Sequence, residues 1–406
     1  MPLVPLAESL TATDFALLSA LGASADRAGT RLWLVGGSVR DALLGRPVLD
    51  LDITSETSAA TLGPVLARDL HGSVSARSQF DTIKLRIDGR SLDLATARSE
   101  RYAHPGALPT VSAAGVTADL ARRDFSVNAM AVSLAPESFG EILDTQHGLD
   151  DLRSGTIRVL HGASFQDDAT RVLRAVRYAT RLGFTIDRAT SNRLRRDLAF
   201  VATVSAPRIR REIERALNEP LAARVLLAMA RHGVLGAIHP SLAGRDTQVA
   251  LGRAARGKLS GLAVLGALVY ALQAEQATAV TKRIDMTSRQ AAVARNVHLI
   301  RDGSHSLANA RPSEVDQAVG GAPLAAIEAC AAVSADQSVR PALRRYLKRI
   351  RSLQMPLNGH AIRSLGITDG PVIGAMLADV RSAALDGNIR SRRGARLFVK
   401  KRIEER

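Results

Sequence analysis

Residues 31–54 switch from a strand pattern to a helix pattern and back over a short distance, and this stretch constrains the fold most. The apolar run at 31–35 is typical of a strand, and a glycine pair interrupts it. We expect Ser38 to cap a short helix over 39–44, because a serine hydroxyl accepts from the free N–H groups at a helix start. A glycine and a proline then end this helix. A strand, a tight turn and a short helix in this order indicate a domain that mixes sheet and helix.

The strand expected over 48–54 carries two aspartates on one face. Apolar and polar residues alternate, so Asp50 and Asp52 project from the same side of the strand. The opposite face is expected to hold Leu49, Leu51 and Ile53. Two neighbouring carboxylates repel each other, and Mg²⁺ removes that repulsion because it prefers oxygen ligands. Taken alone, an Asp-x-Asp pattern is more typical of two solvated strand residues.

The Gly-Gly-Ser turn at 36–38 lies a short way before these aspartates, where a strand ends and a helix starts. Backbone N–H groups of such a turn can cradle a triphosphate, and glycine lets the phosphate approach the backbone. Arg40 adds a charged donor in the first turn of the helix. The turn lacks the signatures of a Walker A loop and of a dinucleotide fold, so alone it is typical of any strand–turn–helix. Its position beside the aspartates favours a nucleotide site.

Residues 83–94 are expected to form a hairpin, because two alternating runs flank an Asp-Gly pair that is typical of a type I′ turn. A two-residue turn places Ile87 opposite Arg90 and Lys84 opposite Asp93. The hairpin register therefore predicts an ion pair across the two strands.

From about residue 165 the apolar spacing is helical. Helices are expected over 167–182, 188–198, 207–218, 222–232, 259–275 and 341–354. We predict four parts. They are a sheet-containing head at 1–150, a helical neck with a nucleotide-reading motif at 151–220, a helical body at 221–340 and a basic helical tail at 341–406.

Positive charge is concentrated near the end of the chain. The 406 residues carry 55 Lys and Arg against 39 Asp and Glu, a formal net charge of +16, and residues 341–406 hold 15 basic and 5 acidic residues. Such a surface favours a polyanionic partner, although a solvated basic tail is the alternative. Aromatic residues make up only 3% of the chain. That scarcity favours a structured nucleic acid held by its phosphates over a single strand held by stacking.

The single cysteine, Cys330, excludes an intramolecular disulfide framework and a thiolate zinc cluster. No stretch reaches the roughly 20 apolar residues of a membrane span, and the first residues lack the pattern of a secretory leader. We therefore expect a soluble, cytoplasmic protein without a membrane partner. The sequence leaves the oligomeric state open.

Five stretches in order resemble the motifs of the class II tRNA nucleotidyltransferase and bacterial poly(A) polymerase superfamily. They are LVGGSVRDALLGRPVLDLDIT at 34–54, ARRDFSVNAM at 121–130, DTQHGLDDLRSGTIR at 144–158, DDATRVLRAVRYATRLGF at 167–184 and SAPRIRREIERAL at 205–217. Together they span close to half the chain. The segment at 357–390 resembles the tail of some tRNA nucleotidyltransferases.

The resemblance implies an α+β fold, in which a small polymerase β-like nucleotidyltransferase sheet domain precedes an all-helical neck, body and tail. It implies that Asp50 and Asp52 are catalytic and hold Mg²⁺. The nucleotide-binding residues that it implies are Gly37, Arg40, Arg123, Asp124, Asn128, Asp168, Arg171, Arg174 and Arg177. Related polymerases often use a third carboxylate, for which Asp93 is the candidate, but the hairpin register favours its ion pair with Lys84.

The motif at 167–184 indicates how bases are chosen. C and A both present an exocyclic amine beside a ring-nitrogen acceptor, so that Asp168 can accept from the amine and Arg171 can donate to the ring. Arg181, on the same arginine-rich helix, is expected to be solvated. Two departures from the motifs, Asp167 and Pro207 where the family has glutamate, affect the packing around this pair and not the metal site.

The resemblance implies a CCA-adding enzyme that transfers CMP and AMP from CTP and ATP to the 3′ end of tRNA and releases pyrophosphate. The alternatives within the superfamily are a poly(A) polymerase and a partial enzyme that adds only CC or only the terminal A. The alternative of another class is a catalytically silent tRNA-binding protein, against which Asp50, Asp52, Arg40 and Arg123 argue because the motif residues are intact.

Overall fold

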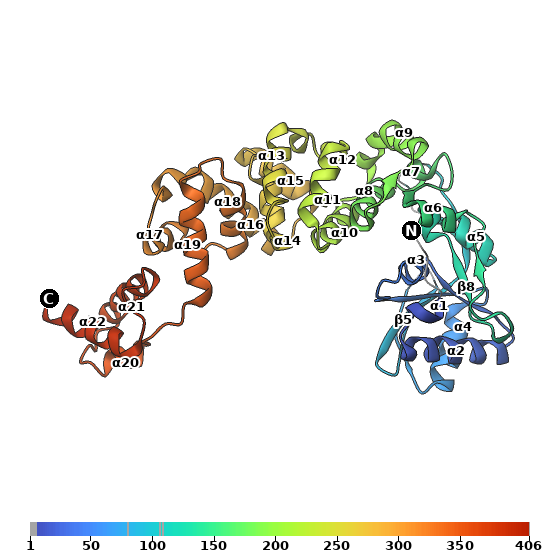
Figure 1. Ribbon diagram of the computed structural model, residues 1–406, viewed down its shortest axis with the longest axis horizontal. Helices are drawn as coiled ribbons and strands as arrows, with labels where there is room; N and C mark the ends of the chain where they lie inside the picture. The colour runs from blue at the N-terminus through green and yellow to red at the C-terminus, as the bar shows by residue number, and fades with distance from the viewer. Residues whose placement is uncertain (1–5, 79–80, 105–106, 108, 406) are drawn as a thin grey trace. The chain divides into compact units, whose positions relative to one another are not determined.

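The computed structural model describes residues 6–405 except 79–80, 105–106 and 108. Contacts divide the chain into two units, Met1–Val204 and Ser205–Arg406, and each unit is described by itself (Figure 1). Among the described residues, the first unit contains all the strands and the second contains only helices. The finer division into head, neck, body and tail stays a prediction.

A seven-stranded mixed sheet forms the centre of the first unit. Its strands follow one another in the order β3 (Ser73–Arg77), β4 (Thr82–Ile87), β5 (Arg90–Thr96), β2 (Leu51–Ser55), β1 (Leu32–Val35), β8 (Ala131–Ser133) and β9 (Ile142–Leu143). β2 and β5 run parallel, and the other neighbouring pairs run antiparallel. The parallel pair places Asp52 directly beside Asp93.

Helices cover the sheet where its strands bury apolar residues. α4 (Ala59–Asp69) contacts β3, β4 and β5, and α2 (Ala12–Arg27) contacts β1 and α4. Along β4, Ile83, Leu85 and Ile87 are buried while Lys84 and Arg86 are exposed. This alternation with a period of two is the physical reason that the segment forms a half-buried strand.

The predicted hairpin is confirmed. β4 and β5 pair with Ile87 opposite Arg90 and with Lys84 opposite Asp93. Asp88 and Gly89 have φ values of 48° and 75°, the two positive values that a type I′ turn requires.

Two local predictions near the first glycine turn are wrong. α3 (Gly37–Leu43) begins before Ser38, and Gly36 rather than a capping side chain precedes it. Leu49 is 75% exposed because β2 begins only at Leu51, although Leu51 and Ile53 are buried as predicted.

The remaining elements of the first unit are α1 (Leu6–Ser9), β6 (Arg98–Arg101), β7 (Thr110–Ala113), α5 (Val116–Ala121), α6 (Gly148–Ser154), β10 (Thr156–Ile157), α7 (Ser164–Asp167), α8 (Thr170–Leu182), β11 (Thr185–Ile186) and α9 (Arg188–Asp197). The helix predicted over 167–182 starts later than expected, because the backbone at Asp168 is extended and separates α7 from α8.

The second unit is a succession of helices. They are α10 (Ala206–Leu217), α11 (Ala222–Arg231), α12 (Val234–Ile238), α13 (Arg245–Ala254), α14 (Gly261–Val269), α15 (Ala274–Ile284), α16 (Ser288–Asp302), α17 (Pro312–Val319), α18 (Leu324–Val333), α19 (Val339–Ser352), α20 (Gly359–Arg363), α21 (Gly370–Leu385) and α22 (Arg392–Glu404). The helix predicted over 259–275 is divided between α14 and α15.

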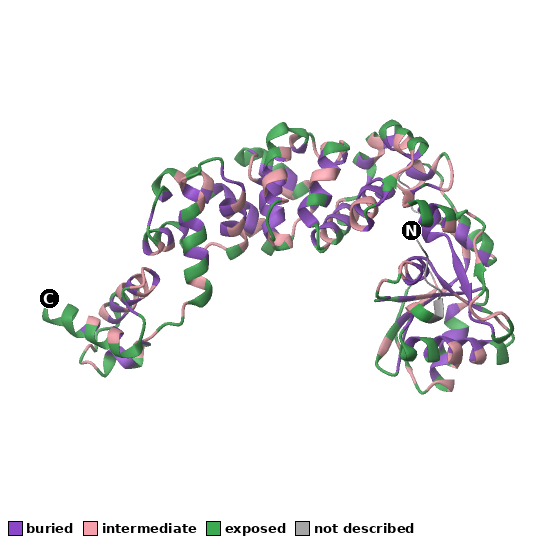
Figure 2. Cartoon of the chain, viewed as in Figure 1, coloured by how far each residue is buried: buried purple, intermediate pink, exposed green. Residues whose placement is uncertain are grey.

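The helices of the second unit carry both buried and exposed residues (Figure 2), and the buried apolar ones form separate clusters. Leu343, Tyr346 and Leu347 of α19 are buried with α16, α17 and α18. α20, α21 and α22 share a cluster of their own. An ion pair from Arg381 to Asp316, with Nε 2.7 Å from Oδ2, connects α21 to α17.

No helix in the described part of the chain is long and apolar enough to cross a membrane.

Candidate active site

Of the predicted catalytic aspartates, Asp52 lies in β2 and Asp50 lies just before it, so the expectation that one strand carries both is wrong, and Ser38 connects both to α3. The Ser38 hydroxyl donates to the backbone carbonyl of Asp50 at 2.8 Å and accepts from the backbone N–H of Asp52 at 3.1 Å. Ser38 is itself buried. A side chain that was expected to cap a helix therefore fixes the position of the two aspartates relative to the glycine turn.

The electrostatic setting of Asp52 suits a cation. Burial raises the pKa of Asp52, the neighbouring Asp93 and Asp50 raise it further, and Arg123 and Arg40 oppose the rise. Asp50 is exposed. Asp93 lies in register with Asp52, and its Oδ1 is 3.4 Å from Lys84 Nζ, so the predicted cross-strand ion pair is confirmed.

Carboxylate oxygens are the donors that a hard divalent cation takes, so Asp50 and Asp52 fit such an ion. Within the described ranges, no group of three His, Cys, Asp or Glu side chains is placed to hold a metal. A pair of carboxylates matches Mg²⁺ sites, in which water and substrate phosphates complete the shell.

Gly36 and Gly37 lie against two of the predicted nucleotide-binding arginines. A Cβ added to Gly36, whose φ is +71°, would lie 2.5 Å from Nη1 of Arg123. A Cβ added to Gly37 would lie 3.5 Å from Nη2 of Arg40. The sequence singled out Gly37, whereas the closer approach is at Gly36.

Arg40 is almost completely buried and makes fixed contacts. Its Nε and Nη2 donate to the two carboxylate oxygens of Asp41 at 2.9 and 2.8 Å, and its Nη1 donates to Asn128 Oδ1. Burial disfavours the charge, but the hydrogen bonds and charge of Asp41 raise the pKa of Arg40. The guanidinium is therefore held as a cation inside the unit.

Asp124 joins the RRDxxxNA-like segment to α8. Its Oδ1 accepts from Asn128 Nδ2 at 2.9 Å, and its Oδ2 accepts from Arg174 Nε at 2.8 Å. Burial raises the pKa of this carboxyl, but Arg174 and Asn128 outweigh burial and lower it to about 2. Asp124 is consequently an anion at every physiological pH.

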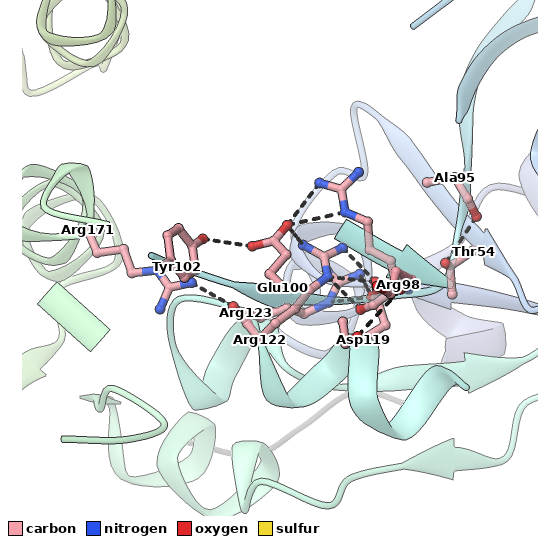
Figure 3. A network of polar contacts seen from close by, with 11 residues as sticks. Thr54, Ala95, Arg98, Glu100, Tyr102, Asp119, Arg122, Arg123 and Arg171 are labelled. Carbon is pink, nitrogen blue, oxygen red and sulfur yellow. Dashed lines mark hydrogen bonds and ion pairs between the residues drawn. The ribbon is translucent and has the colours of Figure 1, made fainter. Parts of the chain in front are cut away.

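A second network holds Arg123 (Figure 3). The buried Asp119 accepts from Arg123 Nη2 at 2.9 Å and also from Arg122. Glu100 accepts from Arg122 and from the hydroxyl of Tyr102. Sequence reasoning missed Asp119, Glu100 and Tyr102, because only the folded chain brings β6 beside α5.

The predicted base-reading pair lies at the junction of α7 and α8. Asp168 Oδ1 accepts from the backbone N–H and the hydroxyl of Thr170 at 2.9 and 2.7 Å. Arg171 is buried and donates to Ser164 Oγ at 2.8 Å and to the backbone carbonyl of Arg122 at 2.6 Å. These contacts fix both side chains at the start of α8, and Figure 3 shows Arg171 reaching the Arg122 segment.

The other arginines of α8 lie on the same side as this site. Arg177 is buried, and its guanidinium lies 4.5 Å from the centre of the Tyr178 ring. Arg181 donates to Asp41 Oδ2 at 3.2 Å, so the expectation that it is only solvated is wrong. Asp41 thus connects α3 with α8 through Arg181, and it also pairs with its neighbour Arg40 within α3.

The predicted site residues fall into linked groups within the first unit. The rings and charges around Tyr178 form one group: Arg40 and Arg177 lie over its ring. Asn128 accepts a hydrogen bond from Arg40 and donates one to Asp124, which accepts in turn from Arg174. Arg123 connects this region to Asp52 electrostatically. The motif at 205–217 lies in the second unit.

Comparisons with known proteins identify the family of the chain. Residues 32–158 match the family described as Poly A polymerase head domain, and residues 183–245 match the probable RNA and SrmB-binding site of polymerase A. A CC-adding tRNA nucleotidyltransferase of Deinococcus radiodurans is 32% identical over 371 residues, which are 90% of this chain and 88% of the relative. The chain belongs to the tRNA nucleotidyltransferase family, and the predicted superfamily is confirmed.

Other relatives are similar to this chain over a smaller share of its length and of their own. An A-adding tRNA nucleotidyltransferase of Halalkalibacterium halodurans is 44% identical over 185 residues, 45% of this chain and 43% of the relative. The chain spans about a quarter of the A-adding relative from Aquifex aeolicus, which is 42% identical over 50% of this chain.

Solved structures match nearly the whole chain. A CCA-adding enzyme in an apo form has a TM-score of 0.80 at 29% identity and covers 98% of this chain and 97% of its own. The Thermotoga maritima CCA-adding enzyme complexed with tRNA has a TM-score of 0.77 at 27% identity, covering 98% and 97%. The predicted α+β fold class, with a sheet domain before a mostly helical remainder, is confirmed.

Proposed function

We propose that this chain adds CCA to the 3′ end of tRNA, transferring CMP and AMP from CTP and ATP and releasing pyrophosphate. The observation that carries the proposal is the placement, in one unit, of the Ser38-bound aspartates beside buried arginines. Likeness to CCA-adding enzymes solved with ATP and with CTP supports the same substrates.

Members of this family generally use divalent metal ions, and we propose Mg²⁺ for this chain. Mg²⁺ bound to Asp50 and Asp52 would lower the pKa of the primer hydroxyl and neutralise the leaving pyrophosphate. The chain's own part is to align the nucleotide. Gly37, Arg40 and Arg123 are proposed to receive the triphosphate, whose charge the arginines match.

Base selection is proposed to come from protein side chains alone. Asp168 accepts from the exocyclic amine of C or A, and Arg171 donates to the ring nitrogen or to the cytosine O2. U and G present the opposite pattern and would leave both side chains without matching hydrogen bonds, which disfavours them. Arg174, Arg177, Asp124 and Asn128 are proposed to hold the rest of the nucleotide.

The partner is proposed to be tRNA, bound through phosphates by the basic end of the chain. Exposed cations on α22 include Arg392, Arg393, Arg396 and Lys400. A tRNA substrate also supports the proposal that the enzyme is cytoplasmic. The similarity to a solved complex of a CCA-adding enzyme with tRNA supports this partner.

The test is to sequence the products formed on tRNA that lacks its 3′ end, with CTP and ATP supplied together and singly. A CCA-adding enzyme yields CCA with both nucleotides and stops at CC with CTP alone. Addition of A only to tRNA ending in CC would identify an A-adding enzyme, the activity named for a relative that is 44% identical over 45% of this chain. Complete absence of Mg²⁺-dependent incorporation would refute the proposed activity.

A further inference from the structure

Tyr178, on α8, is surrounded by three arginines that the proposed nucleotide site uses. The guanidinium carbons of Arg177, Arg40 and Arg174 lie 4.5, 5.1 and 5.4 Å from the centre of its ring. All three distances lie within the range of a cation–π contact. The arginines come from two separate elements, α3 and α8, so the ring is a shared contact between them.

Two further contacts hold the Tyr178 ring in place. Phe125, which is fully buried, meets it edge-on at 5.9 Å with an interplanar angle of 85°. Nη2 of Arg174 lies 3.4 Å from the Tyr178 hydroxyl. The position of the ring is therefore set by the core of the unit rather than by solvent.

A neutral ring solves an electrostatic problem at this point. Three guanidinium groups close together repel one another, and their high pKa prevents them from losing charge. Further carboxylates would relieve the repulsion but would also repel a triphosphate. The negative face of an aromatic ring attracts cations without carrying a net charge, so it can hold the arginines without adding to the carboxylates, Asp41 and Asp124, that already pair with two of them.

We propose that Tyr178 is a positioning residue that keeps Arg40, Arg174 and Arg177 at the spacing required by the triphosphate of the incoming nucleotide. The proposal rests on the proposed nucleotidyltransferase function. It assigns the role to the ring and not to the hydroxyl, because all three guanidinium groups lie over the ring.

The experiment compares Tyr178→Phe, Tyr178→Leu and Tyr178→Met in the full chain. Binding of ATP, CTP and inorganic pyrophosphate is measured without tRNA, so that no turnover occurs. The leucine and methionine variants are expected to bind all three about tenfold more weakly, whereas the phenylalanine variant stays within about twofold of the wild type. The CCA product sequence is expected to be unchanged, because base selection lies elsewhere.

Pyrophosphate separates positioning from simple packing. It has no base or ribose, so its weaker binding reports the arginines directly, and thermal melting of each variant identifies any that fails to fold. Folded leucine and methionine variants that bind pyrophosphate like the wild type would overturn the proposal, and so would a phenylalanine variant as weak as leucine. A wild type that binds ATP and pyrophosphate but makes no CCA would contradict the proposed function and leave the role of Tyr178 standing.

Discussion

At the scale of single residues, two carboxylates of the site differ in how far the protein supplies positively charged partners for them. Asp124 has a pKa lowered to about 2 because Arg174 and Asn128 outweigh burial, whereas the pKa of Asp52 is raised by burial and by its acidic neighbours. The first carboxylate is stabilised by the protein itself. The second is left in a state that a bound cation would relieve, which distinguishes the structural carboxylate from the one proposed to be catalytic.

Replacement of Asp52 by Asn is expected to stabilise the metal-free protein while abolishing nucleotide transfer. A raised pKa in the folded state means that ionised Asp52 costs stability. That cost is absent below the unfolded pKa near 3.8, grows as pH rises and is complete above the folded pKa. With EDTA at pH 8, the variant should melt about one to three degrees above the wild type, and the gap should narrow as the pH falls through the folded pKa toward 3.8.

The matched control for this measurement is Asp150→Asn, because Asp150 is an exposed aspartate of the same unit. The melting temperature of this variant should stay within about one degree of the wild type, because substitutions of exposed residues usually change stability little. A lower melting temperature for the Asp52 variant at pH 8 would contradict the assigned cause of the pKa shift.

Replacement of Asp168 by Ala is expected to lower kcat/KM for both CTP and ATP by about 10- to 100-fold, the range for losing a charged hydrogen bond. Asp168 also caps the start of α8 through Thr170, so the alanine variant loses some stability. Asp168→Asn keeps an oxygen for that cap and serves as the control for folding. Unchanged CTP and ATP kinetics in the alanine variant would refute the base-reading role.

At the scale of elements, the site depends on contacts that join segments far apart in sequence. Ser38 ties α3 to β2, and Asp41 ties α3 to α8 through Arg181. The glycine turn, the aspartates and the arginine-rich helix are therefore held as one assembly.

Replacement of Ser38 by Ala is expected to reduce kcat by about tenfold with little change in ATP affinity, because the aspartates lose their fixed spacing from the glycine turn. Steady-state kinetics and ATP titration of the same preparation measure the two quantities. Ser24→Ala is the matched control, since Ser24 is also a buried serine and donates to Asp69 away from the site. A loss of stability without loss of kcat would show that Ser38 acts only in folding.

Local sequence patterns predicted the helices and strands well, but they predicted the contacts between these elements poorly. The Asp-Gly turn and the alternation on either side of it sufficed for the hairpin register, including the pair Lys84 and Asp93. The roles of Ser38 and Arg181 were missed, because each depends on a partner that lies 12 or more positions away. The motif resemblance named most of the site, yet Tyr178 and Asp119 become visible only when their neighbours are in place.

At the scale of the whole molecule, the positively charged side chains of the two units differ in their surroundings. The arginines of the first unit are largely buried or paired, whereas α22 in the second unit presents exposed cations. α19 is equally basic, but Leu343, Tyr346 and Leu347 are part of an apolar cluster with neighbouring helices. Truncation before α19 would expose that cluster, so charge substitution tests RNA binding more cleanly than deletion.

Changing Arg392, Arg393, Arg396 and Lys400 together to Gln is expected to weaken tRNA binding and flatten its salt dependence. Each lost phosphate contact should reduce the slope of log affinity against log salt by about 0.7 to 0.9. The measurement is tRNA binding over a range of salt, with ATP binding as the internal control that should not change. An unaltered slope would refute the proposal that α22 binds RNA.

The ion pairs of the first unit also have a kinetic consequence. Asp41, Asp119, Asp124 and Glu100 act as internal counter-ions for Arg40, Arg181, Arg123, Arg174 and Arg122. Under the proposed function, an arriving triphosphate would meet arginines that are already paired, so it would compete with resident carboxylates rather than enter an unscreened basic pocket. The same competition favours departure of the pyrophosphate product. Moderate affinity with rapid exchange is the behaviour required of an enzyme that takes up a new nucleotide for every residue it adds.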